Sequence, residues 1–416
     1  MILGKYSFGM GDRFGHQGRA QLAAVLKAQE QGVEITPVWN KSNREHTIIG
    51  TKPADVRKEA DAAVAACGWT GAYHVDADHI GLANVDGFID ASDFFTLDVA
   101  DFIGRPAPDA DVQAFVKKHK GLLGSHRIEG IDEDITIDGP RLQAIVAKYL
   151  IAVQQAGNTF RHIEARKGVG RFVTEVSMDE TDTPQTPMDM LVILAALADE
   201  GIPAQTVAPK FSGRFNKGVD YVGGVSQFAR EFEQDLAVIR FAVEQFGLPA
   251  NLKLSVHSGS DKFSIYRPIH RALQHFDAGV HVKTAGTTWL EEIIGLALAG
   301  GDGLVIAKDI YAKARSRIDE LCGPYATVID IDRTKLPNPD DVRRWDGARF
   351  AATLRHDRRC LEYNPSFRQL LHVGYKVAAE MGPRFTGALE KHEAIIAENV
   401  TANLYDRHVQ PLFLGT

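Results

Sequence analysis

The stretch Phe172–Gly201 reads FVTEVSMDETDTPQTPMDMLVILAALADEG. Its first eight residues are β-rich, and Glu175, Ser177 and Asp179 alternate with apolar neighbours, as in a strand with one polar and one apolar face. A polar turn follows, and a helix is expected from Met188 to Glu200, before Gly201, a common helix terminator. The stretch therefore predicts a strand, a loop and a helix in succession, which is the repeating unit of α/β proteins.

The same succession recurs along the chain and predicts eight strands. The expected strands are Tyr6–Asp12, Val33–Asn40, Ala72–Asp78, Phe172–Asp179, Gln205–Ser212, Leu252–Ser258, Val280–Thr284 and Gly303–Lys308. Eight strands that are each followed by a helix favour a closed (β/α)8 barrel, with a doubly wound open sheet as the alternative.

Two parts of the chain do not follow this alternation of strand and helix. About 90 residues, 81–170, separate the third expected strand from the fourth, which is too long for a simple loop. They predict an inserted, mainly helical subdomain or lid, with a helical stripe from Leu142 to Val153. Residues 326–416 predict a helical extension packed on a barrel domain of residues 1–325.

Composition narrows the class of protein. The 416 residues contain 44% hydrophobic and 24% charged residues and carry a formal net charge of −7, so nucleic acid and anionic membranes are poor candidate partners. The longest apolar run, Met190–Ala198, is too short to span a bilayer. Cys67, Cys322 and Cys360 are odd in number and far apart, which suits free thiols and a cytoplasmic location. A homo-oligomer is compatible with the sequence.

Polar residues gather at the expected carboxyl ends of the strands, where barrel loops converge. We predict that imidazoles from three strands, His79, His257 and His281, hold a divalent ion such as zinc, manganese or nickel. Asp76 is a weaker candidate, either as a fourth oxygen ligand or as a substrate contact. His74 and His162 are weaker still. The alternative for each histidine is an ordinary hydrogen-bonded core or surface position.

Two carboxyl groups are candidates for proton transfer. Asp78 adjoins His79, and Glu175 projects from another expected strand, so the two could serve opposite sides of a substrate. The alternatives are metal-supporting contacts or helix capping for Asp78, and for Glu175 a buried ion pair with Lys210 or Lys283.

Four cations at the same ends, Arg13, Lys210, Arg214 and Lys283, predict an anionic substrate. The run from Thr284 through Ala285 to Thr288 opens a helix, where backbone N–H groups could bind a carboxylate or phosphate, although ordinary helix capping also accounts for it. The glycine-rich pairs do not match a dinucleotide fingerprint, and no Walker motif or nucleophile elbow is present.

Four segments that contain these residues, 73–80, 210–221, 257–263 and 281–289, resemble the tagaturonate/fructuronate epimerases of bacterial hexuronate catabolism, and the likeness extends over essentially the whole chain. The resemblance implies a metal-dependent epimerase that inverts one hydroxyl-bearing carbon of a sugar acid. It also implies that His79, His257 and His281 are metal ligands and that Asp78 and Glu175 are the proton-transfer pair. Relatives of the family act on neutral ketohexoses, so the resemblance leaves the sugar open.

The chemistry of this inversion favours retro-aldol cleavage and re-addition. The inverted carbon is β to the ketone, so its hydrogen is not acidic, and no nicotinamide fingerprint supports transient oxidation. Two alternative functions use the same residues: a metal-dependent aldolase or ketose isomerase, and a sugar-acid binding protein without turnover.

Overall fold

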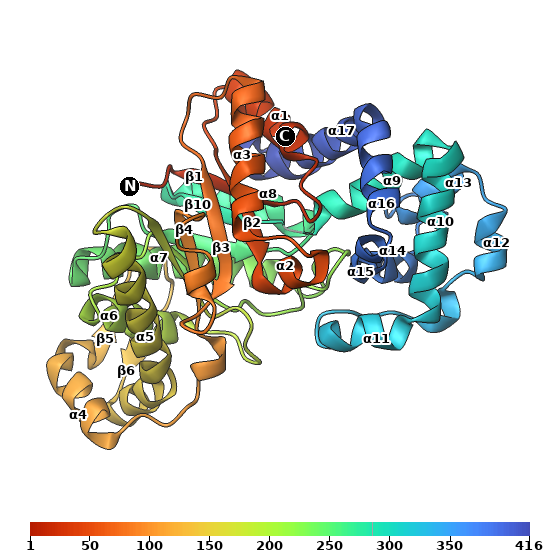
Figure 1. Ribbon diagram of the computed structural model, residues 1–416. Helices are drawn as coiled ribbons and strands as arrows, with labels where there is room; N and C mark the ends of the chain where they lie inside the picture. The colour runs from red at the N-terminus through yellow and green to blue at the C-terminus, as the bar shows by residue number, and fades with distance from the viewer. Residues whose placement is uncertain (285) are drawn as a thin grey trace.

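Eight parallel strands close into a barrel in the order β1-β2-β3-β4-β7-β8-β9-β10, with β10 paired to β1. The computed structural model describes residues 1–284 and 286–416 (Figure 1). Ala285, in the predicted helix-opening run, lies outside the described residues. The barrel confirms the predicted fold class.

Seven barrel strands overlap the expected ones, and the eighth does not. The strands are β1 Tyr6–Gly11, β2 Thr36–Ser42, β3 His74–Ile80, β4 Phe94–Asp98, β7 Val173–Ser177, β8 Thr206–Ala208, β9 Lys253–His257 and β10 Val280–Lys283. The prediction of a strand at Gly303–Lys308 is wrong, because these residues lie inside a helix. The missing strand is β4, which lies within 81–170.

The segment 81–170 therefore supplies part of the barrel as well as added structure. Besides β4 it contains the antiparallel pair β5 Gly124–His126 and β6 Ile135–Ile137, helix α4 Asp109–Lys118 and the long helix α5 Gly139–Lys167. Helix α5 packs against β4 and against α6 (Pro187–Asp199), so it belongs to the layer around the barrel. The predicted helical stripe from Leu142 to Val153 is the buried face of α5.

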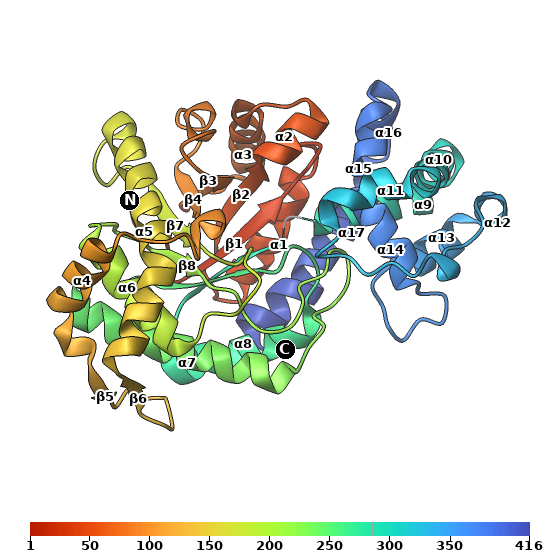
Figure 2. The ribbon, with the colours of Figure 1, turned by 90° about the horizontal axis from the view of Figure 1, so that it is seen from below.

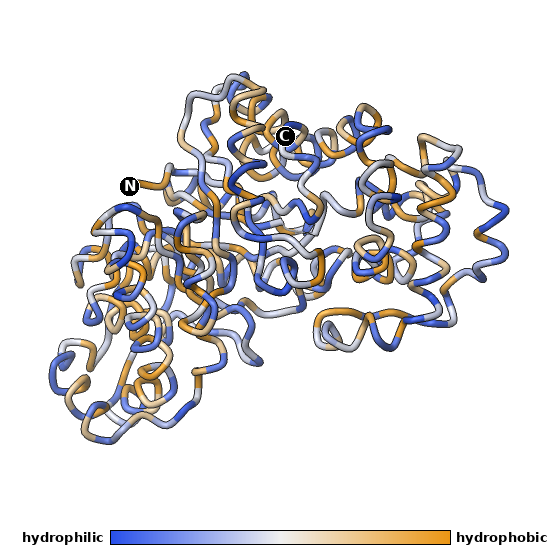
Figure 3. Tube along the Cα trace, in the orientation of Figure 1, coloured by the Kyte–Doolittle hydropathy of each residue, from blue (hydrophilic) through white to orange (hydrophobic). Residues whose placement is uncertain are grey.

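Helices surround the barrel and form a lobe beside it. The remaining helices are α1 Gly18–Glu30, α2 Asn43–Ile49, α3 Pro53–Cys67, α7 Val225–Phe246, α8 Phe263–Phe276, α9 Thr287–Ala299, α10 Gly301–Ser316, α11 Ile318–Cys322, α12 Pro339–Arg343, α13 Gly347–Leu354, α14 Pro365–Val373, α15 Tyr375–Glu380, α16 Pro383–Lys391 and α17 Glu393–Ala402. Helices α10 to α15 lie on the side of the barrel away from α4 (Figures 1 and 2). Hydrophobic and hydrophilic stretches alternate along most helices because these helices bury one face, whereas α6 and α9 are buried on all sides (Figure 3).

The helix layer is completed by the C-terminal segment. The π-helical stretch Asn403–Leu414 packs against both α1 and α8, the helices that follow β1 and β9. Its Phe413 ring lies 5.4 Å from the ring of Tyr6 and 6.1 Å from that of Phe8, both on β1. Residues from the two ends of the chain thus close the ring of helices together.

The barrel interior is apolar at its floor and polar at its mouth. Leu3, Val38, Phe94 and Val173 form a small separate cluster of buried apolar side chains at the amino ends of the strands. Above this floor, buried polar and charged side chains fill the interior. Among the described residues, none of the helices is both long and apolar enough for a membrane span.

Candidate active site

A cleft of about 340 Å³ opens at the carboxyl ends of the strands. It is lined by Arg13, Ser42, Asn43, Arg44, Glu45, Asp78, His79, Asn84, Asp98, Asp179, Glu180, Lys217, His257, Gly259, Lys283, Gly286, Tyr325 and His372. Catalytic groups of (β/α)8 enzymes lie at this end of the barrel.

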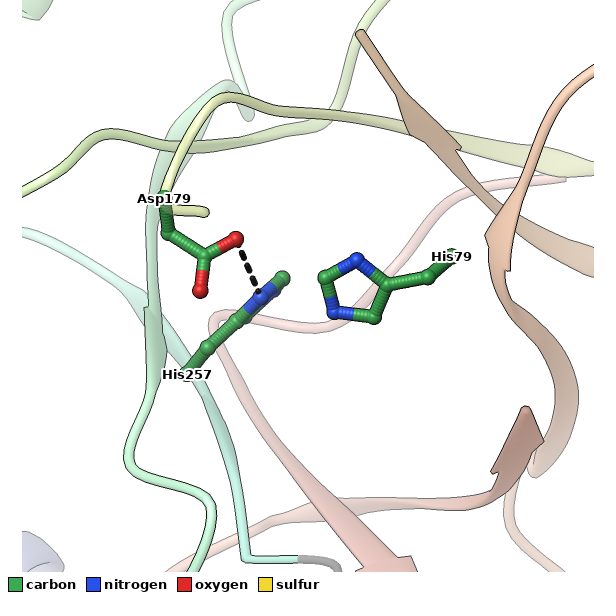
Figure 4. A group of neighbouring side chains, drawn as sticks. All are labelled: His79, Asp179 and His257. Carbon is green, nitrogen blue, oxygen red and sulfur yellow. Dashed lines mark ion pairs between the residues drawn. The ribbon is translucent and has the colours of Figure 1, made fainter. Parts of the chain in front are cut away.

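Two predicted histidines meet in the cleft beside an acid. His79, His257 and Asp179 each offer a ligand atom, and these atoms lie within 4.8 Å of one another (Figure 4). His257 Nδ1 is 3.1 Å from Asp179 Oδ1, and the two imidazole centroids are 5.1 Å apart. A second group on the same side combines His79 with Asp98 and Glu180.

A bulge in β3 directs His79 into the cleft. The pairing of β3 with β4 shifts register between Ala77 and Ile80, and His79 adopts a φ of 53°. Strict alternation would turn neighbouring residues to opposite faces, but a bulge re-aims one side chain. The bulge therefore allows Asp78 and His79, although adjacent in sequence, to line the same cleft.

One ring nitrogen of each imidazole contacts a carboxylate other than Asp179. His257 Nε2 lies 2.8 Å from Glu175 Oε1, and His79 Nδ1 lies 3.1 Å from Asp98 Oδ2. Metal-binding histidines commonly donate their second ring N–H to a carboxylate, which fixes the ring and its tautomer. With Nε2 of His257 bound to Glu175, the other ring nitrogen, Nδ1, faces Asp179 and His79.

The donor set fits a divalent transition metal. Two imidazoles and one carboxylate are the ligands that zinc and its neighbours prefer, and ligand atoms on a tetrahedral ion lie about 3.3 Å apart. Burial lowers the pKa of an imidazole, yet Asp78, Asp98 and Asp179 raise the pKa of His79 to about 10. Burial also lowers the pKa of His257, but Asp179 and Glu175 outweigh this effect and raise the pKa to about 9. The surrounding acids thus stabilise positive charge at the two imidazoles, and a bound cation would supply that charge.

Lys283 neutralises the acids beneath the cleft. Its Nζ lies 2.7 Å from Asp76 Oδ2, 2.9 Å from Asp78 Oδ1 and 2.9 Å from Glu175 Oε1. Burial disfavours the charged amine, but these three carboxylates raise its pKa well above the ordinary value. Lys283 borders the cleft as predicted, but its charge is committed to the protein.

The three acids around Lys283 differ in access. Asp78 lines the cleft, and although burial favours its neutral form, Lys283 and His79 lower its pKa to about 2. Asp76 has a fully buried side chain, and burial raises its pKa to about 7. Glu175 has no exposed surface and contacts Thr96, Thr206, His257 and Lys283 instead of the cleft. Asp78 is therefore the acid with direct access.

The structure does not bring His281 to the other two histidines. His281 pairs in register with Ser7 and Ser255, one inward-facing position below Lys283 and His257, about 6.6 Å deeper along the strands. Its Nδ1 is 2.9 Å from Ser7 Oγ, and its ring packs on Phe94 of the floor. Burial lowers its pKa to about 3. The third side chain in the group with His79 and His257 is Asp179.

Arg13 is the second predicted cation that the structure places on the cleft. Its Nε is 3.0 Å from Glu45 Oε1, its Nη1 donates to the His372 carbonyl, and its guanidinium lies 3.9 Å from the Tyr375 ring centroid. The capping box of Ser42 and Glu45 at the start of α2 holds Glu45 in place.

The other predicted residues lie away from the cleft lining. Arg214 is half-exposed and bonds to the Ile329 carbonyl, while Lys210 makes backbone contacts with Gln185. His74 lies near Asp93, and His162 bonds to Asp86 on the surface.

Several cleft residues escaped prediction for different reasons. The alternation in Phe172–Asp179 already included Asp179, so the signal for this residue was present. Asp98 was hidden because β4 was not recognised. Lys217 lies in a quoted segment without a strand position, and His372 reaches the cleft from α14, which only the tertiary fold reveals.

If His79, His257 and Asp179 hold an ion, replacing Glu175 by glutamine should retain it and lower the rate of turnover about 10- to 100-fold, the usual effect of altering a partner of a metal-binding histidine. The amide can still accept from His257, but it loses the charge that pairs with Lys283. Metal content and turnover of the purified variant check this result. Unchanged turnover would contradict the role of Glu175 in orienting His257.

The barrel and its polar cleft are those of an enzyme, and its relatives place it in the epimerase class of isomerases. The profile of the UxaE tagaturonate epimerase family matches residues 2–400. The chain therefore belongs to the tagaturonate epimerase family, which confirms the resemblance found in the sequence.

Individual relatives agree with this assignment. The tagaturonate/fructuronate epimerase of Thermotoga maritima is 27% identical over 421 aligned positions, which span 98% of this chain and 80% of the relative. A two-glycerol complex of the fructuronate-tagaturonate epimerase UxaE from Cohnella laeviribosi superposes with a TM-score of 0.81 at 24% identity, over 99% of this chain and 83% of that one. The native crystal structure of the same enzyme gives a TM-score of 0.78 at 24% identity, with coverages of 98% and 81%. These structures confirm the fold.

Proposed function

We propose that the protein interconverts D-tagaturonate and D-fructuronate by inverting carbon 4, with a divalent ion held by His79, His257 and Asp179. The observation that carries the proposal is the meeting of this donor set with the Asp78 carboxylate in one cleft. Membership of the tagaturonate epimerase family supports the choice of substrates.

The proposed reaction is retro-aldol cleavage followed by aldol addition. Carbon 4 is β to the carbonyl at carbon 2, so breaking the bond between carbons 3 and 4 leaves its electron pair in an enediolate over carbons 2 and 3. When bound, a divalent ion supplies Lewis-acid stabilisation of the negative charge that develops on the substrate oxygens.

Asp78 is the base in this scheme. Its low pKa keeps it ionised at neutral pH, so it can take the proton of the carbon 4 hydroxyl as that carbon becomes an aldehyde. The aldehyde then turns its other face to carbon 3, the bond re-forms, and the new alkoxide needs a proton. Glu180, an exposed carboxyl group on the cleft, takes a proton from solvent and passes it to this alkoxide, in place of the buried Glu175, and Asp78 releases its own proton to solvent, which restores the starting state.

Metal removal and isotope labelling test the proposal together. Chelator should abolish turnover of tagaturonate, and added Zn²⁺, Mn²⁺ or Ni²⁺ should restore it. In D₂O the fructuronate formed should carry no solvent deuterium at carbon 4, which NMR measures. One equivalent of deuterium there would exclude retro-aldol cleavage.

The products separate the alternative functions. Free three-carbon fragments would indicate a lyase, and a moved carbonyl would indicate a ketose isomerase. Binding of tagaturonate without turnover in the metal-loaded protein would indicate a binding protein.

A further inference from the structure

The cleft is electrically divided. The acids Asp78, Asp98, Asp179 and Glu180 gather around His79 and His257 on one side. The remaining cleft lining contains the cations Arg13, Arg44 and Lys217, together with His372 and Gly286, the residue before α9, and one acid, Glu45, which is paired with Arg13. The catalytic groups described above account for the first side only.

His372 is a buried side chain without a partner at the cationic side. Its exposed fraction is 1%, and neither ring nitrogen has a hydrogen-bond partner among the described residues. A Cβ added at Gly286 would overlap His372 Nε2, so the imidazole lies directly against the N-terminal end of α9. Gly218, at a φ of 77°, also leaves room for the ring, because a Cβ there would lie 3.2 Å from His372 Cβ.

The surroundings of His372 are positively charged. Burial, followed by Arg13, Lys217, Arg368 and Lys262, lowers its pKa well below the ordinary value, so the ring is neutral and carries one N–H donor. Arg13 is paired with Glu45, and Arg368 with Asp261 at 2.7 Å.

Lys217 differs from these arginines, because no carboxylate lies within 4.0 Å of its Nζ among residues 1–284 and 286–416. It follows β8 in the loop that faces Gly259, where an added Cβ would lie 3.3 Å from Lys217 Nζ. A half-buried, unpaired ammonium group, a neutral imidazole and the N-terminus of a helix on one cleft form a site that favours an anion.

We propose that Lys217 and His372 bind the carboxylate of the sugar acid and so select ketohexuronates over neutral ketohexoses. The inference rests on the proposed function, because it names the part of the cleft that distinguishes the substrate class. Placing the carboxylate here separates it from the acids around His79, where like charge would repel it. A neutral ketohexose carries a hydroxymethyl group at this position and leaves Lys217 without its counter-charge.

The test compares an acidic and a neutral sugar on the metal-loaded enzyme. Turnover of tagaturonate and of tagatose is measured for the wild type, Lys217→Ala, Lys217→Arg and His372→Gln, and calorimetry measures tagaturonate binding. Lys313→Ala is the matched control, since Lys313 is an exposed lysine on α10. If tagatose is not turned over, its inhibition constant against tagaturonate replaces kcat/KM.

Lys217→Ala should lower kcat/KM for tagaturonate about 10- to 100-fold, the worth of one hydrogen bond to a charged group. The loss should be mainly in KM and in calorimetric affinity, while the values for tagatose change less than about 3-fold. Lys217→Arg should recover part of the loss, His372→Gln should show the same selective effect, and Lys313→Ala should match the wild type.

Equal losses on both sugars would overturn the inference, because the residues would then support the cleft without reading the carboxylate. A wild type that binds tagaturonate without turnover refutes the proposed function, but a selective loss of that binding in Lys217→Ala still supports the carboxylate site. A wild type that binds no tagaturonate overturns both.

Discussion

Replacing His257 by alanine should remove the metal and the activity together. His257 contacts Glu175 through one ring nitrogen and Asp179 through the other. Loss of one of the three proposed protein ligands should lower metal affinity by more than the roughly 10- to 100-fold typical of contacts outside the ligand set. The rate should fall by about 10³-fold or more, because a metal contributes several kcal/mol of transition-state stabilisation. Metal analysis of the purified protein and turnover of tagaturonate check the two effects.

The control for this variant is His275→Ala, which removes an exposed histidine from α8. It should keep both metal and rate. Asp179→Asn should behave like His257→Ala in metal content, whereas His281→Ala should retain the metal, because His281 lies a layer deeper. Full metal content in His257→Ala would show that the ion is held elsewhere.

Replacing Lys283 by methionine should destabilise the fold by about 3–5 kcal/mol, the usual effect of removing one partner of a buried ion pair. Lys283 is 5% exposed and contacts the carboxylates of Asp76, Asp78 and Glu175, of which two are fully buried. Methionine fills a similar volume but leaves these charges without their counter-ion. Urea unfolding followed by circular dichroism measures the difference.

The urea measurement should be made with metal-free protein, so that loss of the ion does not add to the change. Lys313→Ala serves again as control and should stay within about 0.5 kcal/mol of the wild type, as surface substitutions usually do. A loss below about 1 kcal/mol in Lys283→Met would show that the three carboxylates do not depend on this lysine.

The fold was predictable where strand patterns were strong, and the two errors have a common cause. Gly303–Lys308 contains Leu304, Val305 and Ile306 and resembles a short buried strand. The buried residues of α10 in and just after this run, however, are Gly303, Ile306, Ala307 and Ile310, which recur with helical spacing. The eighth strand is instead Phe94–Asp98, an equally short apolar run that lies inside 81–170. A short apolar run does not distinguish strand from helix by itself.

The sequence predicts which face of each strand carries the site residues, but not how deep in the barrel each residue lies. Alternation correctly indicates that His281 and Lys283 face the same way, yet only the register between strands shows that His281 lies lower. His79 lines the cleft because of a bulge in β3, and no local sequence pattern predicts this bulge. His372 comes from a helix almost 90 residues beyond the last barrel strand, so local patterns could not connect it to the cleft.

The place of Asn403–Leu414 in the helix layer has a consequence for synthesis of the protein. All eight strands leave the ribosome long before this segment does, yet the sides of Tyr6 and Phe8 that contact Phe413 stay uncovered until it arrives. The nascent chain therefore carries a barrel whose helix layer is incomplete while residues 284–402 are added. We expect chaperone dependence, and poor yield of any version shortened before residue 403, to follow from this order of emergence.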